Sequence, residues 1–264
     1  AEFLNKEDAA MKLKEDIDRL AKYQDTLYAQ NTYALLIIFQ ALDAAGKDGT
    51  IKHVMSGINP QGCQVFSFKA PSEEELDHDY LWRASKALPE RGRIGIFNRS
   101  YYEEVLVARI HPEILSKQQL PRNTNGNQIW PDRFEQINNF EKYLVQNGVV
   151  ILKFFLNVSK EEQKKRFLER IERPEKNWKF SATDVKERAF WDDYRKAYQD
   201  VFNNTSTEYA PWYIIPADRK WFTRLAVANI IVNKLKDLNL EYPTLNEEHK
   251  QELAQAKKIL ETES

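Results

Sequence analysis

Short apolar runs alternate along this chain with longer segments in which apolar residues recur every three or four positions. The runs are apolar over nearly their whole length, which is typical of strands buried on both faces of a sheet. We predict strands at 33–40, 63–68, 93–97, 149–155 and 211–215. Because helical segments separate them, this order predicts an α/β fold with a five-stranded parallel sheet covered by helices on both faces.

The segments between the runs carry helical periodicity or helix-start signals. In the first of them Leu13, Ile17 and Leu20 share one helix face. Three pairs of residues have the spacing of a helix start: Ser72 with Glu75, Ser159 with Glu162 and Thr244 with Glu247. We predict helices at about 6–28, 47–57, 72–88, 100–110, 132–147, 159–173, 182–203, 218–237 and 244–262. No repeat or flexible linker interrupts the pattern, so we expect one domain over residues 1–264.

Composition narrows the class of protein. The 264 residues are 42% hydrophobic, enough for a sizeable core, and 30% charged. No apolar run reaches 18 residues, so we expect no membrane span, and the first twenty residues mix charged and apolar positions unlike a signal peptide. Cys63 is the only cysteine, which favours a reducing, cytoplasmic location. The four histidines are scattered and predict no metal cluster.

The segment ALLIIFQALDAAGKDGTIKHV, residues 34–54, has the pattern of a strand, a small-residue loop and a helix. Such a loop can turn its amides inward around phosphate oxygens, and Lys47 adds a mobile positive charge. We expect phosphate or nucleotide contacts from Ala44, Ala45, Gly46, Asp48, Gly49, Thr50 and Lys52. Ala41 replaces the first glycine of the usual motif, which we expect to cost some backbone freedom, and the hydroxyl comes late, at Thr50. The alternative is an ordinary turn with an exposed lysine.

Asp43 is an acid inside this loop. A carboxylate facing phosphates is unfavourable unless a hard cation such as Mg²⁺ lies between them. The alternative is that Asp43 points away and ties the turn through its own backbone. Asn98 directly follows the third predicted strand, at a position where phosphate-loop enzymes commonly have an acid that helps to hold Mg²⁺. We therefore expect Asp43 and Asn98 as metal ligands, with Asp43 the stronger.

Basic residues outnumber acidic ones between Arg83 and Arg109, although the whole chain has a formal net charge of only −1. A protein that handles a phosphate polymer must then concentrate positive charge locally. Arg99 directly follows the third strand and can reach phosphate, and Arg109 lies ten residues further on, about 15 Å away if the segment is a helix. The candidate walls of a polyanion channel are Arg83, Lys86, Arg99 and Arg109. Solvated helix faces with surface arginines are the alternative.

The predicted helix after residue 159 carries Arg166, Arg170 and Arg173, spaced so that they share one face. In a phosphate-loop enzyme such a helix can serve as a lid whose arginines stabilise the transferring group, so we expect all three to be catalytic together with Asp43, Lys47 and Arg99. A solvated helix with Glu–Arg pairs is the alternative.

Three motifs in order, ALDAAGKDGTIKHV, NPQGCQVFSFKAPS and IFNRSYYEEVLVARIHP, followed by WYIIPADRKWF, resemble polyphosphate kinase family 2 over most of residues 30–235. The resemblance implies a P-loop kinase-like three-layer α/β/α fold with a helical lid at about 159–190. It also implies Mg²⁺-dependent, reversible phosphoryl transfer between inorganic polyphosphate and nucleotides, and assembly as a homotetramer.

By position, Asp43 and Lys47 match the acid and lysine of the family's loop, and Asn98 and Arg99 match its second motif. The Asn form, followed by Tyr-Tyr-Glu-Glu, resembles the subgroup that accepts nucleoside monophosphates as well as diphosphates. That implies conversion of AMP to ADP and of ADP to ATP, with GMP and GDP as further substrates.

Two rival functions stay open. One is an ATP-using nucleotide kinase on the same fold, which needs the same loop and lid. The other is a non-catalytic module that binds a polyanion or nucleic acid. The near-zero net charge and the acid in the loop count against the second, so we expect no nucleic acid and no membrane as partners.

Overall fold

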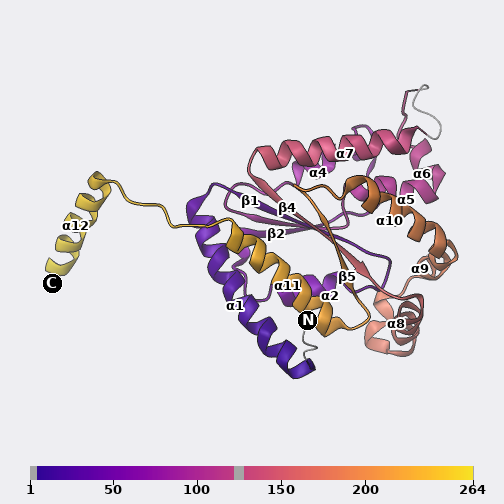
Figure 1. Ribbon diagram of the computed structural model, residues 1–264, viewed down its shortest axis with the longest axis horizontal. Coiled ribbons are helices and arrows are strands. Elements are labelled where there is room, and N and C mark those ends of the chain that lie inside the picture. Colours follow the sequence, from indigo (N-terminus) through magenta and orange to yellow (C-terminus); the bar gives the residue numbers. More distant parts are fainter. Residues whose placement is uncertain (1–4, 122–127, 264) are drawn as a thin grey trace.

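The computed structural model describes residues 5–121 and 128–263, and Figure 1 shows a central sheet between two layers of helices. In this part of the chain the sheet has five strands in the order β2-β3-β1-β4-β5, and every pair of neighbours is parallel. The strands are β1 (Ala34–Gln40), β2 (Cys63–Ser67), β3 (Ile94–Asn98), β4 (Val149–Asn157) and β5 (Trp212–Pro216). The prediction of a five-stranded parallel sheet is confirmed.

The central strand β1 is buried along its whole length. Its register sets Phe39 opposite Asn98 on β3 and Gln40 opposite Phe155 on β4. The carboxyl ends of the three middle strands therefore meet at one edge of the sheet, where ligands of such folds bind.

Alternate residues of β1 enter two separate cores. Leu35, Ile37 and Phe39 pack with α1 (Lys6–Gln30), α2 (Lys47–Val54) and α11 (Lys220–Asp237). Leu36 and Ile38 pack with α4 (Trp82–Lys86), α7 (Ile129–Gln146) and α10 (Trp191–Thr205) on the other face. Strand β1 is thus apolar on both sides because each side faces a helical layer.

The remaining helices are shorter or lie outside these layers. They are α3 (Glu73–Leu76), α5 (Val107–Ile110), α6 (Pro112–Ser116), α8 (Lys160–Glu172), α9 (Ala182–Glu187) and α12 (Glu247–Thr262). Residues 5–121 and 128–263 also contain four 3₁₀ segments: Pro60–Gly62, Tyr101–Val105, Pro174–Lys179 and Arg188–Phe190.

The predicted continuous helix at 72–88 is wrong. Its capping box at Ser72 and Glu75 is present, but α3 ends after one turn. The Asp79 side chain accepts the amide of Leu81 and its carbonyl accepts the amide of Trp82, which forms a turn that restarts the chain as α4. Aspartate competes with the helix by bonding nearby backbone, which explains the break.

Three other predicted helices also differ from the structure. The segment 100–110 is a 3₁₀ turn followed by α5, and 182–203 is divided into α9, a 3₁₀ turn and α10. Helix α12 begins after Asn246, whose side chain caps the amide of His249, so Thr244 is not its cap. Ser159 caps Glu162, but the Glu162 carboxylate bonds Arg166 instead of completing a capping box.

Helix α12 stands apart from the rest of the chain at the end of an extended segment (Figure 1). It contains no buried residue. The segment before it is tied to α1 where the Tyr242 hydroxyl donates to Asp25 at 2.6 Å. Among the described helices, none has the length and hydropathy needed to cross a bilayer.

Buried tyrosines predict how folding stability depends on pH. Burial, and next the neighbouring Glu141, raise the pKa of Tyr101 and Tyr102 well above the usual value of 10.0. In the unfolded chain both titrate near 10. Their contribution to the free energy of unfolding is therefore fully present below that pH and is lost as the pH rises toward their pKa in the folded protein. We expect the free energy of unfolding to fall above pH 10 by about 1.4 kcal/mol per pH unit for each such tyrosine.

The measurement is urea unfolding between pH 8 and 11.5. The Tyr101→Phe variant removes one of these groups, so its stability should fall less steeply above pH 10. An identical pH dependence in the parent and the variant would contradict the assignment.

Candidate active site

A cavity of about 590 Å³ opens at the carboxyl edge of the sheet. Its walls come from the loop between β1 and α2, the ends of β2 and β3, helix α8 and the start of α11. The structure brings together here twelve of the residues that the sequence singles out: Asp43, Ala44, Ala45, Gly46, Lys47, Asp48, Gly49, Thr50, Asn98, Arg99, Arg166 and Arg170. The motif after β1 therefore forms the floor of a real cavity.

The loop has the backbone that phosphate binding needs. Gly46 precedes α2 with a φ of 104°, which glycine adopts without strain, and among the described residues no side chain caps the first amides of this helix. Ala44 also has a positive φ, 61°. Ala41, where the usual motif has glycine, is not among the residues with positive φ; the alanine in the left-handed region is Ala44.

Lys47 lies at the first position of α2, and its Nζ donates to the carbonyl of Ala41 at 3.2 Å. Burial, and next the charge of Arg99, lower the pKa of Lys47, while Asp43 opposes the shift. An anion that entered the cavity would favour the charged form again. The ammonium is thus held above the loop in a position where bound phosphate strengthens its charge.

Asp43 and Arg99 join the ends of two neighbouring strands. Arg99 Nη2 lies 3.2 Å from Asp43 Oδ1, and the amide of Arg99 donates to the carbonyl of Phe39 at 3.0 Å. Arg99 has a φ of 63°, a conformation that non-glycine residues hold only where their surroundings impose it. One residue earlier, Asn98 Nδ2 donates to Asp48 Oδ1 at 2.7 Å.

These oxygen groups suit a magnesium ion. Within residues 5–121 and 128–263 no group of three or more His, Cys, Asp or Glu side chains could hold a metal. Mg²⁺, however, binds with one or two carboxylates and takes its other ligands from water and substrate phosphates. Asp43, Asp48 and the amide oxygen of Asn98 line one cavity and provide that kind of donor set.

Arg166 has a different place from the one expected of a lid arginine. It is 6% exposed, and its five N–H groups are all in use. Nη1 donates to the carbonyls of Ala44 and Ala45 and Nη2 to those of Ala217 and Asp218, at 2.7 to 3.0 Å, while Nε bonds Glu162. Arg166 therefore clamps the phosphate loop to the loop after β5 and has no N–H left for a phosphate.

The three arginines of the predicted lid helix do not form one face toward the cavity. Arg170 lines it and lies 3.6 Å from Asp184. Arg173 is outside the lining, is half exposed, and pairs with Glu169 at 3.1 Å and Glu175 at 2.6 Å. Arg173 therefore does not lie with the other two arginines at this cavity, because it caps the C-terminal end of α8 and faces solvent and two glutamates.

The predicted channel residues are also divided. Arg83 and Lys86 line a neighbouring cavity of about 450 Å³ that shares Ser67–Ala70 with the first one. Arg109 lies elsewhere, 2.7 Å from Asp200. Lys52, expected at the phosphates, is exposed on α2 and outside the cavity. The four basic residues therefore do not line one channel.

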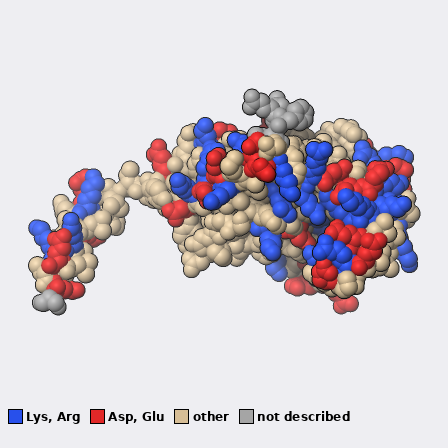
Figure 2. Space-filling model, turned by 90° about the horizontal axis from the view of Figure 1, so that it is seen from below, with Lys and Arg blue, Asp and Glu red and all other residues tan. Residues whose placement is uncertain are grey.

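Other cations complete the first cavity, and the sequence reasoning missed them. They are Lys69, Lys176, Lys179, Lys220 and Arg224. Lys220 and Arg224 lie on α11, just after β5, so the rule that ligands bind at the carboxyl ends of parallel strands could have found them. Burial, and next Arg166, lower the pKa of Lys220, a sign of crowded positive charge. Figure 2 shows charged side chains crowded at the end of the molecule opposite α12, where Figure 1 has α8 and α9.

A second cavity, of about 430 Å³, meets the first at Asp43 and Arg99. Its charge is opposite in sign. Its carboxylates are Asp43, Glu103, Glu113, Asp184 and Glu187, and its arginines are Arg99 and Arg188. Its walls also carry the aromatic side chains of Trp191, Tyr194 and Tyr198. The first cavity, by contrast, has nine Lys and Arg side chains and three carboxylates, Asp43, Asp48 and Glu169.

Comparison with known proteins agrees with this geometry. The profile of the family Polyphosphate kinase 2 (PPK2) matches residues 3–243. The chain belongs to the polyphosphate kinase 2 family. An ADP-polyphosphate phosphotransferase of Rhodopseudomonas palustris is 54% identical over 249 residues, which cover 94% of this chain and 86% of that protein. An AMP/ADP-polyphosphate phosphotransferase of Meiothermus ruber is 46% identical over 85% of this chain and 80% of that protein.

The fold is similar to that of a solved family member. The crystal structure of polyphosphate kinase 2 from Arthrobacter aurescens superposes with a TM-score of 0.87 and 40% sequence identity, over 96% of this chain and 87% of that one. The fold of this polyphosphate kinase 2 chain is therefore that of a P-loop kinase, as its motifs predict.

The clamp predicts that substitutions of Arg166, on α8, and of Arg173, at the C-terminal cap of α8, differ strongly in their effect on stability. Arg166→Met leaves four backbone carbonyls without their donor and should lower the free energy of unfolding by about 2–4 kcal/mol. Arg173→Met removes only exposed, solvent-screened pairs and should leave the free energy of unfolding close to that of the parent. Urea unfolding of both variants measures the difference, and equal losses would contradict the clamp.

Proposed function

We propose that this chain catalyses reversible, Mg²⁺-dependent phosphoryl transfer from inorganic polyphosphate to nucleoside mono- and diphosphates, converting AMP to ADP and ADP to ATP. The observation that carries the proposal is the pair of cavities of opposite charge that meet at Asp43 and Arg99. The cationic cavity suits a polyanion, and the acidic cavity suits a substrate with an uncharged part, such as the base and ribose of a nucleotide. The names of the relatives from Rhodopseudomonas palustris and Meiothermus ruber support the same reaction.

Polyphosphate takes the cationic cavity. Each phosphate unit of this polymer is negatively charged, and a low-dielectric cleft lined mainly by one sign of charge concentrates such a ligand. The amides at the start of α2 would receive its terminal phosphate, with Lys47 above them. Lys220 and Arg224 then face the next phosphate units of the polymer, and the bound polymer relieves their mutual repulsion.

The nucleotide takes the acidic cavity. Trp191, Tyr194 and Tyr198 offer aromatic surface against a base, and carboxylates accept hydrogen bonds from ribose hydroxyls and base amino groups. The same carboxylates repel polyphosphate, so each substrate enters its own side. Nothing in this chemistry is limited to adenine, and we extend the proposal to GMP and GDP.

When bound, Mg²⁺ would be held by Asp43 with Asn98 and would neutralise crowded phosphate oxygens. The chain's own residues do the rest. A phosphate oxygen of the nucleotide forms a bond to the terminal phosphorus of polyphosphate, the P–O bond behind that phosphorus breaks, and polyphosphate leaves one unit shorter. Lys47, Arg99 and Arg170 stabilise the charge that develops on the transferred oxygens. Both reacting groups are phosphates, so positioning dominates over proton transfer.

Arg166 acts in this mechanism by holding the phosphate loop, and Arg173 takes no part. We also propose that the chain works as a homo-oligomer, a tetramer by family resemblance, in the cytoplasm.

The deciding assay supplies AMP, ADP, GMP or GDP with polyphosphate and Mg²⁺ and resolves the products by chromatography. We expect ATP from ADP without any nucleotide donor. Transfer only from ATP to a nucleotide would identify a kinase of another specificity on this fold. Salt-sensitive binding of polyphosphate without turnover would identify a binding module.

Two changes in the loop test the assigned roles. Lys47→Ala should lower kcat by about 10²–10³-fold, the cost of one preorganised donor. Asp43→Asn should abolish the response of the rate to Mg²⁺ while the protein stays folded. Lys52→Ala, on the same helix but outside the cavity, is the control and should keep the parent rate. A parent-like rate in Lys47→Ala would refute the assignment.

Because the two cavities differ in charge, a substitution in either one should change the Michaelis constant of one substrate and not of the other. Lys220→Ala should raise KM for polyphosphate roughly tenfold, because it removes one charge-assisted contact, and should leave KM for ADP nearly unchanged. Glu187→Gln, in the acidic cavity, should raise KM for ADP and leave KM for polyphosphate nearly unchanged. Steady-state kinetics with each substrate varied in turn checks both, and an equal effect on the two constants would contradict the assignment of one substrate to each cavity.

A further inference from the structure

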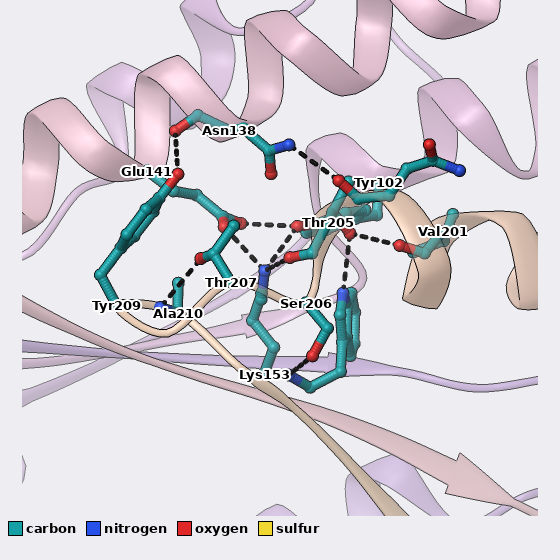
Figure 3. A network of polar contacts seen from close by, with 12 residues as sticks. Tyr102, Asn138, Glu141, Lys153, Val201, Thr205, Ser206, Thr207, Tyr209 and Ala210 are labelled. Atoms are coloured by element: carbon teal, nitrogen blue, oxygen red, sulfur yellow. Dashed lines mark hydrogen bonds and ion pairs between the residues drawn. The ribbon is translucent and has the colours of Figure 1, made fainter.

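An ion pair is enclosed between the sheet and the helices that cover its second face (Figure 3). Lys153 lies in the middle of β4 and Glu141 on α7, and both side chains are 0% exposed. Lys153 Nζ donates to Glu141 Oε2 at 2.7 Å, to the Tyr102 hydroxyl at 2.8 Å and to the carbonyl of Thr205 at 2.7 Å. All three N–H groups of the ammonium are therefore satisfied without water.

The pair reaches the active site through two tyrosines. The hydroxyls of Tyr101 and Tyr102 both donate to Glu141 Oε1, at 2.9 and 2.7 Å. These tyrosines begin the 3₁₀ turn that follows Arg99 and Ser100. The ion pair thus holds the chain two and three residues beyond the arginine that meets Asp43.

Arg99 needs such support from its surroundings. Its left-handed backbone is unfavourable by itself, and in this conformation its side chain lines both cavities. On the near side the turn is bonded to β1, since the Ser100 hydroxyl donates to Gln40 Oε1 at 3.2 Å. On the far side Tyr101 and Tyr102 tie it to the ion pair.

Stability alone does not explain why charges are enclosed here. Two ions lose their hydration when buried, and apolar side chains of similar volume commonly give equal or greater stability. A Lys–Glu pair instead fixes direction, because hydrogen bonds between charged groups and hydroxyls tolerate little displacement. The benefit of this pair is therefore geometric.

We propose that Lys153 and Glu141 are positioning residues for phosphoryl transfer, which hold Tyr101 and Tyr102 and through them keep Arg99 aimed at the junction between the cavities. The proposal rests on the function proposed above. Neither charged group touches substrate, so their loss acts through the turn after β3. The expected signature is a lower kcat with little change in either KM.

The test removes the two hydroxyls that connect the turn to the pair. Tyr101→Phe/Tyr102→Phe keeps both rings and leaves Lys153 and Glu141 in place. Tyr209→Phe is the matched control, since its hydroxyl donates to the carbonyl of Asn138 on the same helix α7 and has no bond to the turn. The second test protein is Lys153→Met/Glu141→Leu, which replaces the pair with apolar groups.

Three quantities are measured on each full-length protein: kcat with both KM values, the thermal midpoint, and amide hydrogen exchange of residues 98–105 without substrate. We expect kcat to fall about tenfold to a hundredfold in the double tyrosine variant, as for a misplaced group, with both KM values within about threefold of the parent. Hydrogen exchange of residues 98–105 should become faster than in the parent and in Tyr209→Phe. Lys153→Met/Glu141→Leu should show the same pattern.

A folded double tyrosine variant with the kcat and the exchange rate of the parent would overturn the proposal. If that variant does not fold, the single changes Tyr101→Phe and Tyr102→Phe decide by the same criteria. If the parent transfers no phosphate from polyphosphate, the proposed function fails, and the exchange rate of residues 98–105 still shows whether the pair holds the turn.

Discussion

One buried guanidinium joins the two loops on which the site is built. Arg166 bonds carbonyls of the phosphate loop with one nitrogen and carbonyls after β5 with the other. Unpaired carbonyls in this interior would be costly, so the two loops can reach this arrangement only with the arginine between them. Because α11 follows directly, the same clamp helps to hold Lys220 and Arg224 in the cavity that Lys47 also lines. The cationic cavity therefore depends on an arginine that has no N–H free for a ligand.

Two different structural features flank the junction of the two cavities at Asp43 and Arg99. On the first face of the sheet, α2 presents bare amides and Gly46 gives them room. On the second face, Lys153 and Glu141 hold the turn that follows Arg99. Parallel strands bring both features to one edge, since β1 is paired in register with β3 and β4. The site is thus assembled from pieces that are far apart in sequence and fixed by the sheet.

The sequence predicted those parts that depend on local pattern. Apolar runs located all five strands, most clearly the three middle ones, because strands covered on both faces have no polar alternation. The loop at 41–50 and the pair Asn98–Arg99 were found because both directly follow strands. The spacing of Arg166, Arg170 and Arg173 gave a shared helix face, but spacing does not tell which partners each guanidinium meets. Arg109 is paired with Asp200, a partner 91 positions away in the chain that only the folded structure reveals. The bonds around Lys153 were missed for the same reason, since a lysine within an apolar run gives no sign of what encloses it.

The separation of α12 from the other elements affects how this molecule unfolds. A helix of 16 residues is only marginally stable in water when nothing packs against it, and none of its residues is buried within this chain. Its melting is thus uncoupled from that of the two cores around the sheet, and nothing in the catalytic body is disturbed when it frays. Denaturation of a single chain is then not one all-or-none transition: a diffuse loss of helical signal precedes the cooperative collapse of the sheet.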